Sequence, residues 1–334
     1  MKPFSRMLEL ALVGGLLLTT CSVTTNADQS INLFKAQTTN DATVATTQKI
    51  QKLTQADLNH FIPTQAQKVI GNQVTDPGSD AIFIPKVNYQ ASQNPQNQLK
   101  VPNGYTLKKL KYAASNKAIG NYRIQIQMGK IGLRGLAINS FTPAKRDLKR
   151  PVNLNRITFA QSKELTRFAL LILNPAIQKL GGIPYRATTN SIQFAQASAD
   201  VYSKDNWNNT GDKTGHDPKV KPVVSKAFNV KDVAEENYSD NPSFNLTSPK
   251  LKQRTVSMAT LKATIYSSMA IQMYEDGPSY WGHATALMNL DIHPKYQPNY
   301  FGVGFDKFGG IHFMMVPHNH LVNRAFVLGQ VVVE

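Results

Sequence analysis

The sequence predicts an α+β protein, because a stretch with the apolar spacing of helices is followed by two short runs typical of strands. Helical spacing of apolar residues fills much of the stretch from residue 157 to residue 275. Two short apolar runs, Tyr300–Phe305 and Ile311–Val316, then flank Asp306–Gly310, which is typical of a hairpin with a Gly-Gly turn. Helices followed by an antiparallel pair indicate helices packed on a small sheet.

Length and composition exclude several classes of protein. The 334 residues suffice for one large domain or two modest ones, and 41% hydrophobic residues permit a core. Beyond the N-terminus no apolar run is long enough to span a bilayer, which excludes a multi-span membrane protein. A single cysteine excludes disulfide frameworks and Cys-ligated zinc. Glycine motifs for nucleotide phosphates and for a serine nucleophile are both absent.

The first 27 residues have the pattern of a secretory signal peptide. Lys2 and Arg6 precede the short apolar run Leu10–Leu18. Two processing sites remain open: a cut after Ala27, or lipidation of Cys21 after a lipobox-like Leu-Thr-Thr. Either alternative places the mature protein outside the cytoplasm, extracellular or at the cell surface, and the lack of other cysteines suits a Gram-positive exterior.

The rest of the chain divides into four regions. Residues 28–99 are polar and predict a flexible spacer. Residues 100–156 are basic and partly β, since apolar residues alternate over 122–128 and Gly129-Lys130 resembles a turn, which predicts a hairpin ending at Ile138. Residues 157–320 form the ordered domain, and residues 321–334 a C-terminal strand or tail.

Three helices are expected in the ordered domain. Thr158 and Gln161 form a capping box before a helix that reaches Leu180, with Pro175 expected to kink or split it. A second helix is expected over Ser191–Ser203, and a third over 258–273, where apolar residues follow one face. Residues 204–250 are rich in Asn, Asp, Lys and Pro and predict long loops.

Basic residues are concentrated in the front half. Residues 100–156 hold 13 Lys and Arg against the single acid Asp147, a net charge of +12. This stretch either binds a polyanion, which outside a Gram-positive cell means anionic cell-wall polymer or the membrane surface, or is simply solvated. Few aromatic residues are interleaved, so we expect no nucleic acid. The candidate anion-binding residues are Lys108, Lys109, Lys111, Lys145, Arg146, Lys149 and Arg150.

Two histidines and two acids form a candidate site. His216 stands in a polar loop, His283 follows Gly282, and Glu236 and Glu275 lie between them. Such residues bind a divalent cation such as Zn²⁺, or act as acid and base. The alternative is four unrelated loop residues.

Three further histidines lie near the C-terminus. His312 shares a strand face with Met314 and Val316, which favours a half-buried structural role, and His318 and His320 are expected in a loop.

The order of motifs resembles the CAP superfamily, also called SCP-like. The motifs are the helix Leu165–Leu180, Gly215-His216, Glu235-Glu236-Asn237, the helix ending at Glu275, Gly282-His283 and Phe301–Phe305. Val101–Thr106, Asn139–Phe141, Arg146-Asp147 and Val152–Leu154 add a resemblance to the surface-exclusion proteins of Gram-positive bacteria.

The resemblance implies a three-layer α-β-α sandwich and a cleft in which His216, His283, Glu236 and Glu275 hold a cation, Zn²⁺ or Ca²⁺. Asp276 competes with Glu275 for its role, and Glu235 replaces the usual Gly. The function that we expect first is a secreted or cell-surface binding protein that contacts other surface molecules, including another cell-surface protein. The alternatives are a metal-assisted hydrolase acting on peptide or cell wall, with Glu236 and Glu275 as its acids, and a lipid or apolar-ligand binder. No catalytic residue is assigned beyond that alternative.

Overall fold

A three-stranded antiparallel sheet lies at the centre of the fold. The computed structural model describes residues 86–88, 90–118, 121–207, 213, 215–231, 235–239, 254–290, 299–322, 324–327 and 330–331. The predicted signal peptide, its two candidate processing sites at Cys21 and Ala27, and residues 28–85 of the expected spacer lie outside this part. The sheet has the order β5-β8-β7, with β5 at Glu235–Ser239, β7 at Tyr300–Phe305 and β8 at Ile311–Val316. The predicted hairpin is therefore confirmed at both strands.

Strand β5 corrects the expectation of long loops over residues 204–250. Its sequence, Glu-Glu-Asn-Tyr-Ser, lacks the apolar alternation of a half-buried strand. It pairs with β8 in register, with Glu236 opposite Met314 and Tyr238 opposite His312. Tertiary pairing, which a local pattern does not report, makes this segment a strand.

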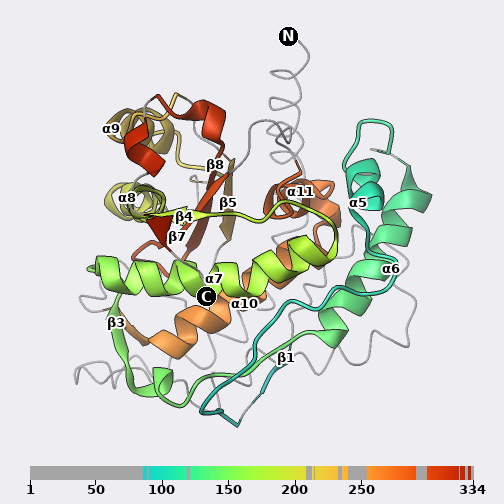
Figure 1. Ribbon diagram of the computed structural model, residues 1–334, viewed down its shortest axis with the longest axis horizontal. Coiled ribbons are helices and arrows are strands. Elements are labelled where there is room, and N and C mark those ends of the chain that lie inside the picture. The colour runs from blue at the N-terminus through green and yellow to red at the C-terminus, as the bar shows by residue number, and fades with distance from the viewer. Residues whose placement is uncertain are drawn as a thin grey trace.

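Helices cover both faces of the sheet. Val303, Phe313 and Met315 pack into the core that α7 (Phe159–Lys179) and α10 (Met258–Tyr274) share, whereas Met314 and Val316 pack with Phe194 of α8 (Thr189–Asp205). Successive residues of a strand face opposite sides, so α8 forms one outer layer and α7 with α10 the other. Figure 1 shows α8 beside the strands and α7 and α10 crossing below them. This is the three-layer α+β arrangement that the resemblance implies.

The three predicted helices are present with slightly different ends. Helix α7 spans Phe159–Lys179 and begins with the predicted capping box of Thr158 and Gln161. Pro175 lies inside it, and the helix continues past that residue rather than splitting. Helix α8 spans Thr189–Asp205, and α10 spans Met258–Tyr274.

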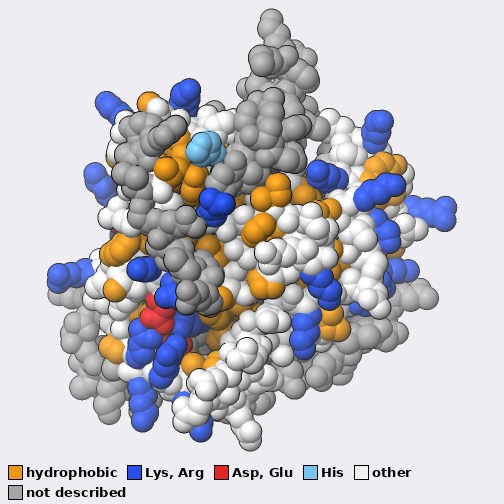
Figure 2. All heavy atoms as spheres, in the orientation of Figure 1, with side chains coloured by type: hydrophobic (Ala, Val, Ile, Leu, Met, Phe, Trp, Pro, Cys, Tyr) orange, Lys and Arg blue, Asp and Glu red, His pale blue; other side chains and the backbone are white. Residues whose placement is uncertain are grey.

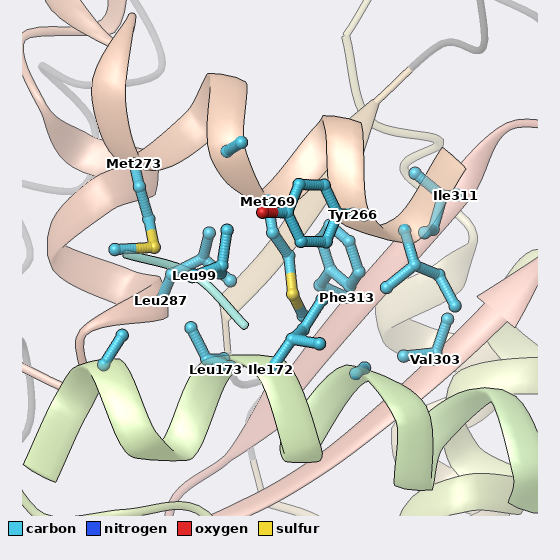
Figure 3. Close-up of a cluster of buried hydrophobic side chains, with 14 of the residues drawn as sticks. Leu99, Ile172, Leu173, Tyr266, Met269, Met273, Leu287, Val303, Ile311 and Phe313 are labelled. Carbon is cyan, nitrogen blue, oxygen red and sulfur yellow. The ribbon is translucent and has the colours of Figure 1, made fainter. Parts of the chain in front are cut away.

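Helix α10 is the most enclosed element. Nearly all of its residues are buried, around its whole circumference. Figure 3 shows Met269 and Met273 of this helix meeting Ile172 and Leu173 of α7, with Phe313 of β8 close by. A largely apolar helix with no exposed face must be covered on every side, so α10 determines where its neighbours lie.

The expected hairpin in the basic region is wrong, because residues 122–138 form a helix. Helix α5 spans Leu107–Ala113 and helix α6 spans Tyr122–Ile138. The buried residues of α6 recur at helical spacing, and they include two glycines: Gln125, Met128, Ile131, Gly132, Gly135 and Leu136. A β-carbon at Gly132 would lie 1.8 Å from the carbonyl oxygen of Tyr274. Glycine here permits close helix packing, where the sequence suggests a turn.

The remaining elements connect these layers. Strand β1 (Lys86–Val87) pairs in parallel with β2 (Ser140–Phe141), and Leu99 is buried in the core, so the end of the expected spacer packs on the domain. Two further antiparallel pairs join β3 (Pro151–Asn153) to β6 (Thr255–Ser257), and β4 (Ala187–Thr188) to β9 (Gln330–Val331). The latter pair confirms a C-terminal strand for the last residues described. The shorter helical elements are η1 (Asp147–Lys149), η2 (Lys221–Ser225), α9 (Lys226–Phe228), η3 (Gly277–Ser279), α11 (Gly282–Leu287), η5 (His318–His320) and η6 (Arg324–Val327).

None of the helices that the structure describes combines the length and the apolar character needed to cross a membrane.

The approach of α6 to α10 predicts opposite effects of two glycine substitutions. Gly132→Ala places a methyl group against the Tyr274 carbonyl and should lower the free energy of unfolding by about 1–3 kcal/mol. Gly129→Ala, on the same helix with nothing within 4 Å, should raise it by about 0.5–1 kcal/mol. Urea denaturation measures both, and equal stability of the two variants would contradict the packing of α6.

Candidate functional site

Glu236 lies at the centre of a chain of charged side chains on the α8 face of the sheet. Its carboxylate is 7% exposed, and both oxygens are engaged. Oε2 lies 3.1 Å from Nδ1 of His216 and accepts a hydrogen bond from the Tyr202 hydroxyl at 3.2 Å. Oε1 lies 2.7 Å from Nδ1 of His312. The predicted pair of His216 and Glu236 therefore forms, with a second histidine added.

His312 is wholly buried between two carboxylates. Its Nδ1 faces Glu236, and its Nε2 lies 3.3 Å from Oδ2 of Asp306. The other Asp306 oxygen accepts from the backbone of Phe308 and Gly310, which fixes the β7–β8 turn. An imidazole donates at both nitrogens only when it is protonated, so this geometry favours imidazolium.

Burial and hydrogen bonding act in opposite directions on these groups. Burial by itself would lower the pKa of His312, but its hydrogen bonds with Asp306 and Glu236 outweigh burial and raise the pKa to about 9. Burial would raise the pKa of Glu236, yet the bonds with His216 and His312 lower it to about 2. Both groups therefore stay charged at neutral pH.

Aromatic rings enclose the buried end of this chain. The ring centroid of Tyr202, from α8, lies 4.3 Å from that of His312, and the Tyr238 centroid lies 4.9 Å from it. Tyr202 also binds the loop that carries His216, since its hydroxyl accepts from the Asp217 backbone at 3.0 Å. The exposed end is His216, whose side chain is 42% exposed.

His283 belongs to a separate pair with Asp276. Its Nδ1 lies 2.7 Å from Oδ1 of Asp276, and Oδ2 accepts from the backbone of Ala284 at 2.9 Å. Burial lowers the pKa of His283, but the charge of Asp276 outweighs burial and raises it. Tyr280 and Trp281, which precede Gly282 and this histidine, have positive φ angles of 49° and 65°, a strained backbone of the kind found at functional sites.

The two histidine pairs lie on different sides of strand β5. Glu236 faces α8, whereas the next residue, Asn237, donates to Gln272 of α10 and to the carbonyl of His283. Of the two acids that compete at the end of α10, Asp276 makes this contact with His283. In the part of the chain that the structure describes, no three His, Cys, Asp or Glu side chains are placed to hold a metal ion.

This donor set fits a divalent cation poorly. Both oxygens of Glu236 already accept hydrogen bonds, and the imidazolium form of His312 has no lone pair for a metal. Each of His216 and His283 does have its Nδ1 oriented by a carboxylate, as metal-binding histidines usually have. Cation binding by these residues stays a prediction.

The basic region forms two separate clusters of cations. Helices α5 and α6 with their connection expose seven Lys and Arg: Lys108, Lys109, Lys111, Lys117, Arg123, Lys130 and Arg134. We call this surface the α5–α6 hairpin. Lys145, Arg146 and Lys149 are exposed around η1, next to β3. Figure 1 places β3 and α5 at opposite sides of the molecule, and Figure 2 shows one group of blue side chains near each.

Arg150, by contrast, takes part in an internal ion cluster. It donates to Glu164 at 2.8 and 2.6 Å and to Asp147 at 2.9 Å. Lys262 of the buried helix α10 contacts the same two carboxylates, each at 2.7 Å. The only acid of the basic region, Asp147, is thus buried and paired, and the guanidinium of Arg150 is used within the protein.

The predicted site lacks several residues of these networks, among them Asp306, Tyr202, Asp276 and Lys262. Asp276 competes with Glu275 in the sequence, and the bond with His283 decides between them. Lys262 carries a signal, because it is the only charged residue in an otherwise apolar helical pattern. Asp306 resembles an ordinary turn residue, and no local signal separates Tyr202 from other aromatic residues of a core.

Comparisons with known proteins give a likeness at the level of structure. No protein-family model matches the chain, and no curated protein matches it. Among solved structures, the chain is similar to the CAP domain of Enterococcal PrgA, with 18% sequence identity and a TM-score of 0.49. The match covers 71% of this chain and 91% of that domain. CAP is the group that the motifs resemble, and at this level of likeness any function must rest on the chain's own residues.

The charge chain predicts how stability depends on pH. The raised pKa of His312 stabilises the fold fully below its ordinary value of 6.5, and this contribution is lost as the pH rises through 9. The lowered pKa of Glu236 stabilises the fold above 4.5, and that contribution is lost as the pH falls towards 2. The free energy of unfolding should therefore decline above pH 6.5, by at most ~1.4 kcal/mol per pH unit from this group.

Urea denaturation between pH 5 and pH 10 measures this decline. His312→Gln should be less stable at pH 6 by about 3–5 kcal/mol, because Glu236 loses a buried partner, and its alkaline decline should be smaller. His318→Gln, at an exposed position, serves as the control. An unchanged alkaline slope in His312→Gln would show that another group titrates.

The cation hypothesis predicts Zn²⁺ binding that disappears in the double variant His216→Ala/His283→Ala. Because neutral imidazole is the ligand and the pKa of His283 is raised, affinity should fall as the pH is lowered. Isothermal titration calorimetry of the wild type and the double variant decides. Equal heats for the wild type and the double variant would show that any metal binds elsewhere, at the exposed His318 and its neighbour His320.

Proposed function

We propose that this chain is a secreted cell-surface binding protein that attaches to an anionic cell-wall polymer through the α5–α6 hairpin. The observation that carries this proposal is the one-sided charge of that surface. All seven Lys and Arg between residues 107 and 138 are exposed, and the same stretch contains no Asp or Glu. Unpaired exposed cations concentrate polyanions at a surface, and the attraction needs no shaped pocket.

Packing supports the orientation of this surface. The inner face of α6 is fixed against α10 by Gly132 and Gly135, which leaves the outer face to the solvent. The cations of α6 lie on that outer face at positions 123, 130 and 134. The secretory signal predicted for residues 1–27 supports a location where such polymer occurs.

The other half of the chain suits a second partner. Residues 157–334 contain 17 Lys and Arg and 14 Asp and Glu, a net charge of +3 against +13 for residues 1–156. A protein held by its basic half presents this nearly neutral half away from the polymer. Contact with another cell-surface protein, as the resemblance to surface-exclusion proteins implies, would use that half.

The geometry of Glu236 argues against the hydrolase alternative. A general base must release its lone pair to a water proton, and its strength falls with its pKa. The pKa of Glu236 is about 2, and both its oxygens are occupied. The lipid-binding alternative has no observation in its favour.

The first test is retention on purified cell walls at low and high salt. Retention should fall steeply with salt, because exposed charges are screened beyond ~8 Å at physiological ionic strength. The triple variant Lys108→Glu/Lys111→Glu/Lys130→Glu should lose most retention. Lys145→Glu/Arg146→Glu/Lys149→Glu changes the charge equally at the η1 cluster and should lose less. Arg150 stays unchanged, because its ion cluster supports the fold.

Salt-independent retention would contradict the proposal, and so would full retention of the hairpin variant. Equal losses in both triple variants would contradict the assignment to the α5–α6 hairpin. The variant Cys21→Ala tests the alternative mechanism, which is retention by a lipid anchor. Loss of retention in that variant would indicate such an anchor.

A further inference from the structure

A tight turn next to helix α5 is held rigidly in the surface of the α5–α6 hairpin. The amide of Tyr105 donates to the carbonyl of Pro102 at 3.1 Å, and Gly104 within this turn has a φ of 86°. Tyr105 is buried, and its hydroxyl donates to the carbonyl of Met273 in α10 at 2.8 Å. The turn is therefore fixed to the most enclosed helix of the protein.

Two cations from different helices converge over this turn. A β-carbon at Gly104 would lie 3.6 Å from Nζ of Lys109 and 3.9 Å from Nη2 of Arg134. Both charged groups thus lie within 4 Å of one point, where Gly104 has no side chain and where Cδ1 of Ile131 would also lie 3.8 Å away. The guanidinium is oriented by a hydrogen bond from Nη2 to the carbonyl of Asn103 at 3.4 Å.

No carboxylate balances this pair within the part of the chain that the structure describes. Neither Lys109 nor Arg134 takes part in an ion pair there, although Lys219, Arg150 and Lys262 do. Two cations this close repel each other, and they gain free energy when an anion lies between them. The remaining cations of the hairpin have no such shared point among the contacts that the structure gives.

We propose that Lys109, Arg134 and the Gly104 turn form a binding site for a phosphate group. This proposal rests on the proposed function and gives the polyanion a specific chemistry. A guanidinium presents a planar fork of N–H donors that matches two phosphate oxygens, and an ammonium supplies a point charge to a third. Because Gly104 has no side chain, none of its own atoms shields the two cations from an anion at this turn. The phosphodiester groups of a wall polymer would occupy the site one at a time.

The test compares single neutral substitutions within the hairpin of the full secreted chain. Lys109→Gln and Arg134→Gln should each weaken the binding of poly(glycerol phosphate) about tenfold, as expected for one charge-assisted hydrogen bond. Lys111→Gln and Lys130→Gln remove one exposed cation from the same two helices and should weaken it about twofold or less. Calorimetry at fixed ionic strength measures the four values of Kd, and circular dichroism confirms that each variant is folded.

Three further probes identify the source of the phosphate. Inorganic phosphate should compete with the polymer for the site, whereas acetate at equal ionic strength should not. Vesicles of phosphatidylglycerol with phosphatidylcholine, against phosphatidylcholine alone, test a lipid headgroup as the source. We expect tighter binding to the polymer, while a preference for the anionic vesicles would support the same site with lipid phosphate as its ligand.

Equal effects of all four substitutions would overturn this inference, and so would equal competition by acetate and phosphate. If wall retention remains salt-sensitive and specific to the hairpin in that case, the proposed function stands without the phosphate site. If retention proves independent of salt, both fall together.

Discussion

The burial of helix α10 is the constraint on which the rest of the structure depends. A helix without a polar face cannot lie at a surface, so every direction around it must be filled by another element. Helix α7, the sheet, α11 and the glycine face of α6 fill these directions. The basic region is therefore part of the fold of the ordered domain rather than an appendage, because it covers one side of the central helix.

Ionic groups inside this fold are neutralised in two distinct ways. Lys262, carried by α10, is balanced by Asp147 and Glu164, which are shared with Arg150. His312 is charged by its position between two carboxylates, and it joins β5, β8 and the β7–β8 turn. A buried pair of this kind contributes little net stability compared with apolar packing, but breaking it leaves a charge without a partner. Both clusters therefore matter more for determining which segments of the chain lie together than for the net free energy of folding.

The sequence predicts well those elements whose signal is local. The capping box at Thr158, the apolar face of α10 and the Gly-Gly turn of the last hairpin each lie within a few residues, and all are confirmed. Helix α6 and strand β5 are wrong or missing for a common reason. Helix α6 needs glycines because Tyr274, which is far away in the sequence, packs against it. Segment β5 is a strand because it pairs with β8.

In the candidate site, too, the sequence predicts what has a local signal and misses what depends on contacts between distant segments. The pairing of His216 with Glu236 follows from residue types that the resemblance brings to attention, and the competition between Glu275 and Asp276 is visible in the sequence. That Glu236 is shared with His312 depends on the register of β5 against β8, which no spacing along the chain reports. Likewise, Arg150 is indistinguishable from its basic neighbours until Glu164 is placed beside it.

The two faces of helix α6 have consequences for how this protein can change. Two of its inner positions, Gly132 and Gly135, admit only the smallest residue, because Tyr274 of α10 lies against them. Its outer positions contact solvent, where substitutions usually alter stability by less than about 0.5 kcal/mol. Folding and charge are thus encoded by different residues of one helix. Successive exchanges on the outer face can therefore change the charge of this surface while the core that supports it remains the same.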